Sequence, residues 1–222
     1  MPGPKVGPTT PEVDPLKSNW PKFERKAPKA AVPGKATDYF DEDFDGPRYD
    51  WKWLPGGTRV AAGKPGVSGA LEVDANKGFH MDGSVGDGEV SLTLWRDMDE
   101  AERRKVGADS KAYEIQFRYS GPNDYHALQV RGDGYYRVVR VSGGKTTTLV
   151  GDNKGDYLPV PGWDRDAEYD RVVLTFRGKS VAGTFNGRRL ATTEAAGEGA
   201  GKVGLRTMNG LAVAIEKLSV DE

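Results

Sequence analysis

The chain has 222 residues, enough for one large all-β domain or two small domains. Its 32 basic and 33 acidic side chains nearly cancel, so we expect neither a nucleic-acid partner nor attraction to a membrane surface. Because the chain has no cysteine, the sequence excludes disulfides, thiol catalysis and cysteine-ligated zinc. No apolar run reaches the length of about 18 residues that a membrane span requires.

Residues 1–36 form a proline-rich segment with a basic composition. They hold eight of the 14 prolines, and seven Lys or Arg residues outnumber three Asp or Glu residues. Because proline fixes φ and removes a hydrogen-bond donor, we predict an extended arm, either disordered or docked on a neighbouring protein subunit. Trp20 and Phe23 are the expected anchors for docking, because aromatic side chains supply most of the apolar area. The first residues lack the apolar stretch of a signal peptide, so we expect synthesis in the cytoplasm.

The stretch DYFDEDFDGPRYDWKW (38–53) gathers five Asp and one Glu around aromatic residues. A strand here would place Phe40, Glu42 and Phe44 on one face, and would place Tyr39, Asp41, Asp43 and Asp45 on the other. Two buried Phe residues beside exposed acids are typical of a strand near a sheet edge, where charge deters unwanted pairing. We therefore predict that the arm ends here and that a second region, residues 37–222, begins.

From residue 70 onward the chain consists of short β-rich runs broken by Gly, Asn and Asp. The runs cover residues 70–74, 89–95, 112–119, 125–131, 135–142, 146–151, 170–177, 180–186, 188–194, 201–207 and 211–220. Several alternate with a period of two, which indicates strands with one buried face. In the third run, Tyr113, Ile115, Phe117 and Tyr119 are predicted to share a face. About a dozen such strands predict an all-β, two-sheet antiparallel sandwich, or jelly roll.

One segment, RDMDEAERRKVG (96–107), breaks this pattern. Its acids come first and its bases last, with Asp99 and Arg103, and Glu100 and Arg104, four residues apart. That order suits the helix dipole and side-chain pairing along a helix. We predict a short surface helix or a loop between strands, with a solvated charged face.

The second half of the chain carries a recognisable pattern of strands and turns. YDRVVLTFRGKSVAGTFNGRRLATTE (169–194) contains Asn186-Gly187 between two strands, and Gly201, Gly204-Leu205 and a last strand at 212–220 follow. This resembles the closing half of a concanavalin A-like lectin/glucanase jelly roll of the laminin-G-like kind. The resemblance spans about residues 38–221 and implies that the first strand pairs beside the last. Members of that superfamily bind sugars, hydrolyse them or hold proteins together, so the resemblance leaves the activity open.

The sequence offers no clear catalytic set. Glucanases of this superfamily carry Glu-x-Asp-x-x-Glu or a close variant on one strand, whereas this chain offers Glu72 with Asp74 in one run and Glu114 alone in another. His80 and His126 have no nucleophile motif beside them, and we expect ordinary hydrogen-bonded histidines. We therefore expect no enzyme, and a glycoside hydrolase with an unrecognised site stays as an alternative.

Calcium is the one cofactor that the sequence admits. Loop carboxylates are the ligands that Ca²⁺ prefers, and lectin-like domains often use them. The leading candidates are Asp82, Asp87, Asp152 and Asp156, and the acids at 41, 43 and 45 are a minority alternative. Ordinary turn chemistry explains the same residues equally well.

Aromatic side chains that can stack on a sugar are the other candidate site. Trp51 and Trp53 alternate in YDWKW, while Tyr157 and Trp163 lie in a turn-rich loop. Packing in the core or at its edge is the competing interpretation for the tryptophans.

These observations favour a non-catalytic recognition or assembly module. The leading prediction is a structural or decoration-type subunit of a larger particle, such as a phage virion, with protein partners bound through the arm. The alternative is a free-standing carbohydrate-binding domain, with glycans as partners.

Overall fold

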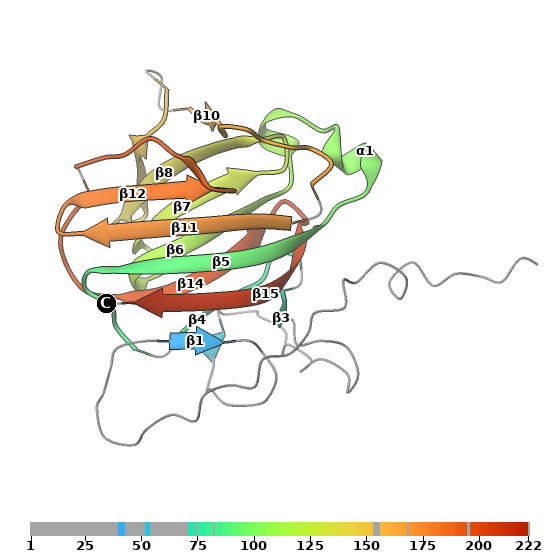
Figure 1. Ribbon diagram of the computed structural model, residues 1–222. Helices are drawn as coiled ribbons and strands as arrows, with labels where there is room; N and C mark the ends of the chain where they lie inside the picture. Colours follow the sequence, from blue (N-terminus) through green and yellow to red (C-terminus); the bar gives the residue numbers. More distant parts are fainter. Residues whose placement is uncertain are drawn as a thin grey trace, which may run out of the picture. The chain divides into compact units, whose positions relative to one another are not determined.

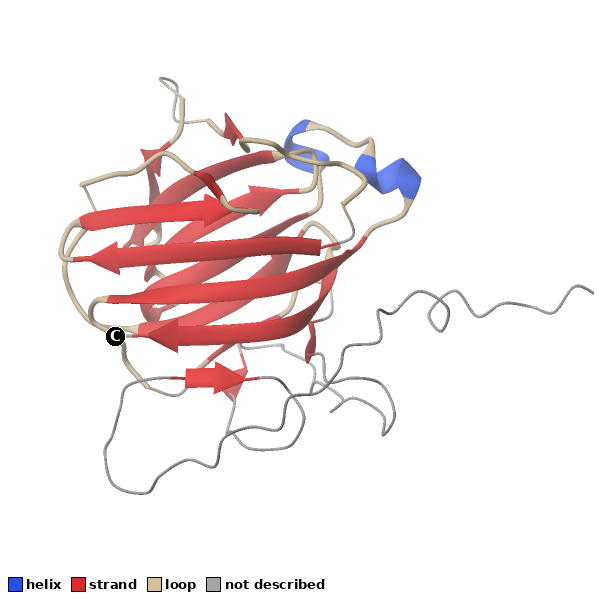
Figure 2. Cartoon of the chain, viewed as in Figure 1, coloured by secondary structure: helices blue, strands red, loops and turns tan. Residues whose placement is uncertain are grey.

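The computed structural model describes residues 40–42, 52–53, 71–73, 75–81, 83–152, 156–167, 169–194 and 196–221. They form two antiparallel sheets packed face to face (Figures 1 and 2), which confirms the predicted β-sandwich. The predicted arm with Trp20 and Phe23 lies outside the described residues, as do Trp51, Asp43, Asp45 and Asp82. Within the described part of the chain, no helix has the length and apolar character to cross a membrane.

The first sheet contains the start and the end of the described chain. Its strand order is β1 (Phe40–Glu42), β15 (Ala212–Asp221), β5 (Gly88–Asp97), β11 (Tyr169–Arg177), β12 (Ser180–Phe185) and β13 (Arg188–Arg189), and β3 (Leu71–Val73) also pairs with β15. Phe40 lies opposite Val220, so the first strand pairs with the last, as the family resemblance implied.

The second sheet packs behind the first in Figure 1. Its strand order is β10 (Leu158–Pro159), β8 (Tyr135–Ser142), β7 (Asp124–Arg131), β6 (Ala112–Gly121), β14 (Lys202–Met208), β4 (Gly78–His80) and β2 (Lys52–Trp53), and β9 (Lys145–Val150) also pairs with β8. Several neighbours are joined by short hairpins, such as the β12–β13 turn at Asn186-Gly187, where both residues have positive φ.

The core lies between the two sheets and follows the alternation of the sequence. Val90, Leu92 and Leu94 of the first sheet are buried, and Phe117 of the second sheet stacks on Phe176 of the first with ring centroids 5.0 Å apart. Burial of each such side chain contributes roughly 1.5–3 kcal/mol, so this inner layer is the main source of stability.

A β-bulge in β6 corrects one prediction. The pairing of β6 with β7 loses its regular register between Phe117 and Gly121, and Arg118 adopts φ 49°. A bulge adds one residue and turns the following side chains to the opposite faces. Arg118 therefore enters the end of the sandwich, where its guanidinium lies over the Phe176 ring, and Tyr119 moves to the outer face. The prediction that Tyr119 shares a face with Phe117 was wrong for this reason.

The charged segment after β5 contains the predicted short helix. This helix, α1, spans Glu100–Arg103, and a 3₁₀ turn follows at Gly107–Asp109. Asp99 caps α1 through the Glu102 N–H in a capping box, and Glu100 pairs with Arg104 as expected. Arg96 differs from the prediction, because it belongs to β5 and is buried instead of lying on a solvated face.

Arg96 forms a buried ion pair with Asp170 of β11. Their side chains approach to 3.1 Å, and the Tyr113 hydroxyl donates a hydrogen bond of 3.2 Å to Asp170. Burial raises the pKa of Asp170 to about 6, while the charge of Arg96 and the bond from Tyr113 oppose that rise. The ion pair and the bond from Tyr113 together link β5, β11 and β6. A shift in register would break these contacts and leave an uncompensated charge in the core, so they favour the observed register.

His126 is a further polar residue that is buried between the sheets. It lies on β7 opposite Phe117 of β6, and the centroids of the two rings are 5.4 Å apart. Neither nitrogen of the His126 ring has a hydrogen-bond partner. Burial, together with the positive charges of Arg118 and Arg140, lowers the pKa of His126 to about 4. The histidine is therefore neutral in the native state at pH 7.

We predict that His126→Leu reduces the acid sensitivity of the fold. In the unfolded chain a histidine protonates near pH 6.5, so the wild type loses stability as the pH falls from about 6.5 to about 4. Asp170 acts in the opposite direction between pH 3.8 and about 6, but it is present in both proteins. Urea denaturation at pH 7.5 and pH 4.5 is expected to show a smaller loss for the variant, by about 2 kcal/mol. An equal loss in both proteins would contradict a neutral, buried His126.

Candidate functional site

Four polar side chains form a row on the outer face of the second sheet. In register, Arg137 (β8) lies opposite Gln129 (β7), Gln129 opposite Glu114 (β6), and Glu114 opposite Arg206 (β14). Each alternates with core residues along its strand, so the row faces away from the first sheet. With strands about 4.8 Å apart, the row spans about 14 Å.

Glu114 is the centre of a hydrogen-bond network on this face. Its side chain is 1% exposed and accepts two bonds, from Gln116 Nε2 at 2.6 Å and from Gln129 Nε2 at 2.9 Å. The amide oxygens of these residues accept in turn, Gln116 from His80 Nε2 at 2.6 Å and Gln129 from Arg137 Nε at 2.7 Å. The carboxylate thus orients both carboxamides, because its oxygens accept a hydrogen bond from the amide group of each.

His80 ends the network on one side. Burial lowers the pKa of His80, and the charge of Lys202 adds to this effect while the bond to Gln116 opposes it. The ring is therefore neutral at pH 7, and the Nε2–H tautomer satisfies Gln116, whose amide group already donates to Glu114. Tyr119, which the β-bulge turns outward, stacks on the His80 ring with centroids 3.6 Å apart.

Tyr157 ends the network on the other side. Its hydroxyl donates a 3.1 Å bond to Gln129, and the guanidinium groups of Arg137 and Arg131 lie 4.4 and 4.6 Å from its ring centroid. Arg131 is itself fixed by Asp133 of the β7–β8 turn. Tyr157 therefore lies on the outer face, where cation–π contacts with its ring hold the guanidinium groups of Arg131 and Arg137 in place.

Further tyrosines border the same face. The rings of Tyr119 and Tyr125 lie 5.9 Å apart, and both side chains are partly exposed. Burial raises the pKa of Tyr125, the charge of Glu114 adds to this, and a hydrogen bond with Arg206 opposes it. The outer face thus has a buried polar layer beneath partly exposed tyrosines and arginines.

Trp163, the predicted sugar-binding tryptophan whose side chain the structure describes, lies at the edge of the core. Trp163 packs against Phe185 at 5.5 Å, and Arg96 covers its ring at 4.3 Å, which is packing at the edge of the core. Trp53 belongs to β2 and is paired with Phe79, and its side chain is not among those described.

The predicted calcium ligands make turn contacts. Asp87 accepts from the Gly178 N–H at 2.8 Å and pairs with Arg118, and Asp152 accepts from the Asp156 N–H at 2.8 Å. Among the described residues, no three His, Cys, Asp or Glu side chains come together as metal ligands. Calcium binding stays a prediction.

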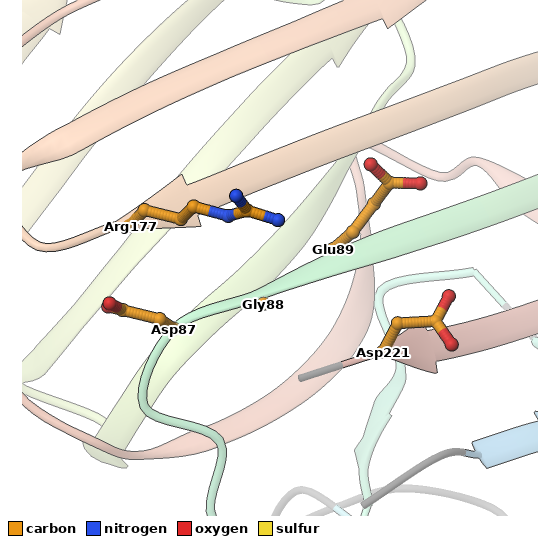
Figure 3. Close-up of a pocket in the computed structure, with 5 residues that line it drawn as sticks. All are labelled: Asp87, Gly88, Glu89, Arg177 and Asp221. Carbon is orange, nitrogen blue, oxygen red and sulfur yellow. The ribbon is translucent and has the colours of Figure 1, made fainter.

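One shallow cavity, of about 350 Å³, lies on the outer face of the first sheet (Figure 3). It is lined by Asp87, which precedes β5, by Gly88 and Glu89 of β5, and by Arg177 and Asp221 of the neighbouring strands β11 and β15. Glu89 and Asp221 are directly opposite each other, and Glu89 accepts a 3.1 Å bond from Thr175. The outer face of the second sheet is the stronger candidate, because a buried hydrogen-bond network around Glu114 holds its polar side chains in place.

Most of this site was not predicted from the sequence. Glu114 was expected to be an isolated acid and His80 an ordinary hydrogen-bonded residue, and no role was predicted for Gln116, Gln129 or Arg137. The available signal was alternation, because Glu114 and Gln116 occupy the outward positions of a strand whose inward positions are apolar.

Comparison with known proteins supports the fold class. No protein-family model and no curated protein matches the chain. Among solved structures, the chain is similar to the carbohydrate-binding module CBM66 from Bacillus subtilis, with 12% identity, TM-score 0.56, and coverage of 78% of this chain and 95% of that one. It is also similar to a Bacillus licheniformis β-glucanase, with 12% identity, TM-score 0.59, and coverage of 83% and 98%. A Bacillus subtilis protein of unknown function with a galectin-like fold gives 12% identity, TM-score 0.55, and coverage of 82% and 94%. The chain therefore shares the two-sheet jelly-roll fold of these proteins.

We predict that Glu114→Gln destabilises the protein by about 2 kcal/mol. A glutamine amide at this position would face the amide donors of Gln116 and Gln129, leaving a buried donor without an acceptor. Urea denaturation measures the loss. The matched control is Glu100→Gln on α1, where the carboxylate is 81% exposed and the expected change is within about 0.5 kcal/mol. Equal stability of Glu114→Gln and the wild type would contradict the proposed orientation of both carboxamides.

Proposed function

We propose that this chain is a non-catalytic glycan-binding protein whose ligand binds to the outer face of the second sheet. The observation that carries the proposal is the network around Glu114, which fixes arginine and tyrosine side chains on one face. Sugar recognition requires oriented polar groups for the hydroxyls and aromatic rings for the apolar sugar faces. This face supplies both kinds of group.

The partly exposed side chains of this face are the groups that would contact a sugar. Tyr125 offers a ring, and Arg206, which is 46% exposed, offers donors beside it. Both rest on Glu114, because Arg206 lies 3.7 Å from that carboxylate and interacts with Tyr125. A pre-oriented set of this kind lowers the entropy lost on binding. The carbohydrate-binding and galectin-like structures cited above are consistent with a sugar ligand.

The acid content of the face favours binding over hydrolysis. Retaining and inverting glycosidases generally require two carboxyl groups across the scissile bond. On β6, the residues at the spacing of the glucanase motif are Glu114, Gln116 and Tyr119, so one of three positions is an acid. That single carboxylate already accepts two amide hydrogen bonds. These features support a non-catalytic role.

The assembly hypothesis has less support. It depended on the arm at residues 1–36, which lies outside the described residues. None of the structures compared above carries a description as a particle subunit. We therefore place glycan binding ahead of the virion role that the sequence analysis favoured.

A glycan array of neutral and acidic oligosaccharides, followed by calorimetric titration of the best binder, tests the proposal. We expect binding by the wild type and at least a tenfold loss for Tyr125→Ala, which is about 1.4 kcal/mol. The control is Tyr169→Ala, because Tyr169 is 51% exposed on the first sheet. No binding by the wild type, or an equal loss in the control, would contradict the proposal.

A further inference from the structure

Arg137 differs from the other arginines that are held in place beside the core or on the outer face. Arg96, Arg118, Arg131 and Arg206 each have a carboxylate within 4.0 Å. Arg137 has no carboxylate partner among the described residues. Its neighbours are instead neutral, namely Gln129 and Tyr157.

These neighbours hold the Arg137 guanidinium in one orientation. Nε donates to Gln129 Oε1 at 2.7 Å, and the Tyr157 ring lies 4.4 Å from the guanidinium carbon. Gln129 is in turn fixed by Glu114 at 2.9 Å. Nε is occupied by Gln129, and the Tyr157 hydroxyl also makes a hydrogen bond with the Arg137 side chain. The terminal nitrogens of a guanidinium form a planar fork, the geometry that binds a carboxylate through two parallel hydrogen bonds.

The charges of the row leave Arg137 uncompensated. Asp133 balances Arg131, and Glu114 lies within 3.7 Å of Arg206. Gln129 separates Arg137 from Glu114 in the register, which is two strand spacings or about 10 Å. The Gln129 side chain therefore separates the negative charge of Glu114 from the Arg137 guanidinium, and the Arg137 end of the row is positive.

We infer that Arg137 binds the carboxylate of a uronic acid, and that the ligand is an acidic glycan. This inference rests on the proposed function and names its substrate class. Fixed by Gln129 and Tyr157, the guanidinium pairs with the sugar carboxylate, while the tyrosines of the outer face contact the ring. Charge-assisted bidentate pairs are stronger than neutral hydrogen bonds, so the acid group contributes a large part of the selectivity.

The test compares acidic oligosaccharides with their own neutral forms. Hexamers of galacturonate, glucuronate and mannuronate, and the same hexamers with each carboxyl group reduced to a hydroxymethyl group, are titrated by calorimetry. We expect at least one uronate to bind at least tenfold more tightly than its reduced form. The preference is expected to weaken as salt is raised from 20 to 300 mM, because salt screens the pairing.

Variants separate the carboxylate contact from general damage to the face. Arg137→Gln is expected to remove the preference while it retains binding of the reduced hexamer. Arg171→Gln, an exposed arginine on the first sheet, is the matched control and should retain the full preference. Circular dichroism and melting temperature confirm that both variants fold.

The outcomes distinguish this inference from the proposed function. Equal binding of acidic and reduced hexamers, or an equal loss of both in Arg137→Gln, would overturn the carboxylate site and leave glycan binding standing. Preference for a sulfated neutral hexamer over every uronate would also overturn it. Binding of no hexamer, together with no binder on the glycan array, would overturn the proposed function itself.

Discussion

The carboxylate of Glu114 is the group on which the outer face of the second sheet depends. It accepts hydrogen bonds from Gln116 and Gln129, and so determines which way each carboxamide points. Their oxygens can then accept from His80 and Arg137. A buried carboxylate is stable only when its oxygens accept hydrogen bonds. Glu114 can therefore be buried on β6 only because Gln116 and Gln129 donate to it, and both carboxamides are oriented only because Glu114 is there. The partly exposed tyrosines and arginines rest on this layer.

The fold was predictable because its signals are local. Alternation identified the strands, Asn186-Gly187 identified a hairpin, and the acidic first strand pairs with the last as the resemblance implied. The site was less predictable, because it is made by register between strands far apart in sequence. Arg137, Glu114 and Arg206 come together only once β8, β7, β6 and β14 are aligned. A one-residue slip would send each of them to the core.

The β-bulge at Arg118 shows why alternation alone was insufficient. A strict period of two assigned Tyr119 to the core, whereas one residue at φ 49° turns it outward onto His80. The same irregularity brings Arg118 to Asp87 and to the Gly197 carbonyl at the end of the sandwich. Bulges are common beside binding sites because they redirect side chains without breaking the sheet. The jelly-roll scaffold is shared by binding proteins and hydrolases, so the side chains of this face, and not the fold, carry the functional argument.

The proposed function requires that ligand binds to the outer face of the second sheet. The most direct measurement is a titration of ¹⁵N-labelled protein with an oligouronate hexamer, followed by backbone amide chemical shifts. We expect the shifts to change along β6, β7, β8 and β14, with the largest changes near Glu114, Gln129 and Arg137. Changes concentrated on β5, β11 and β15, around the acidic cavity of the first sheet, would contradict it.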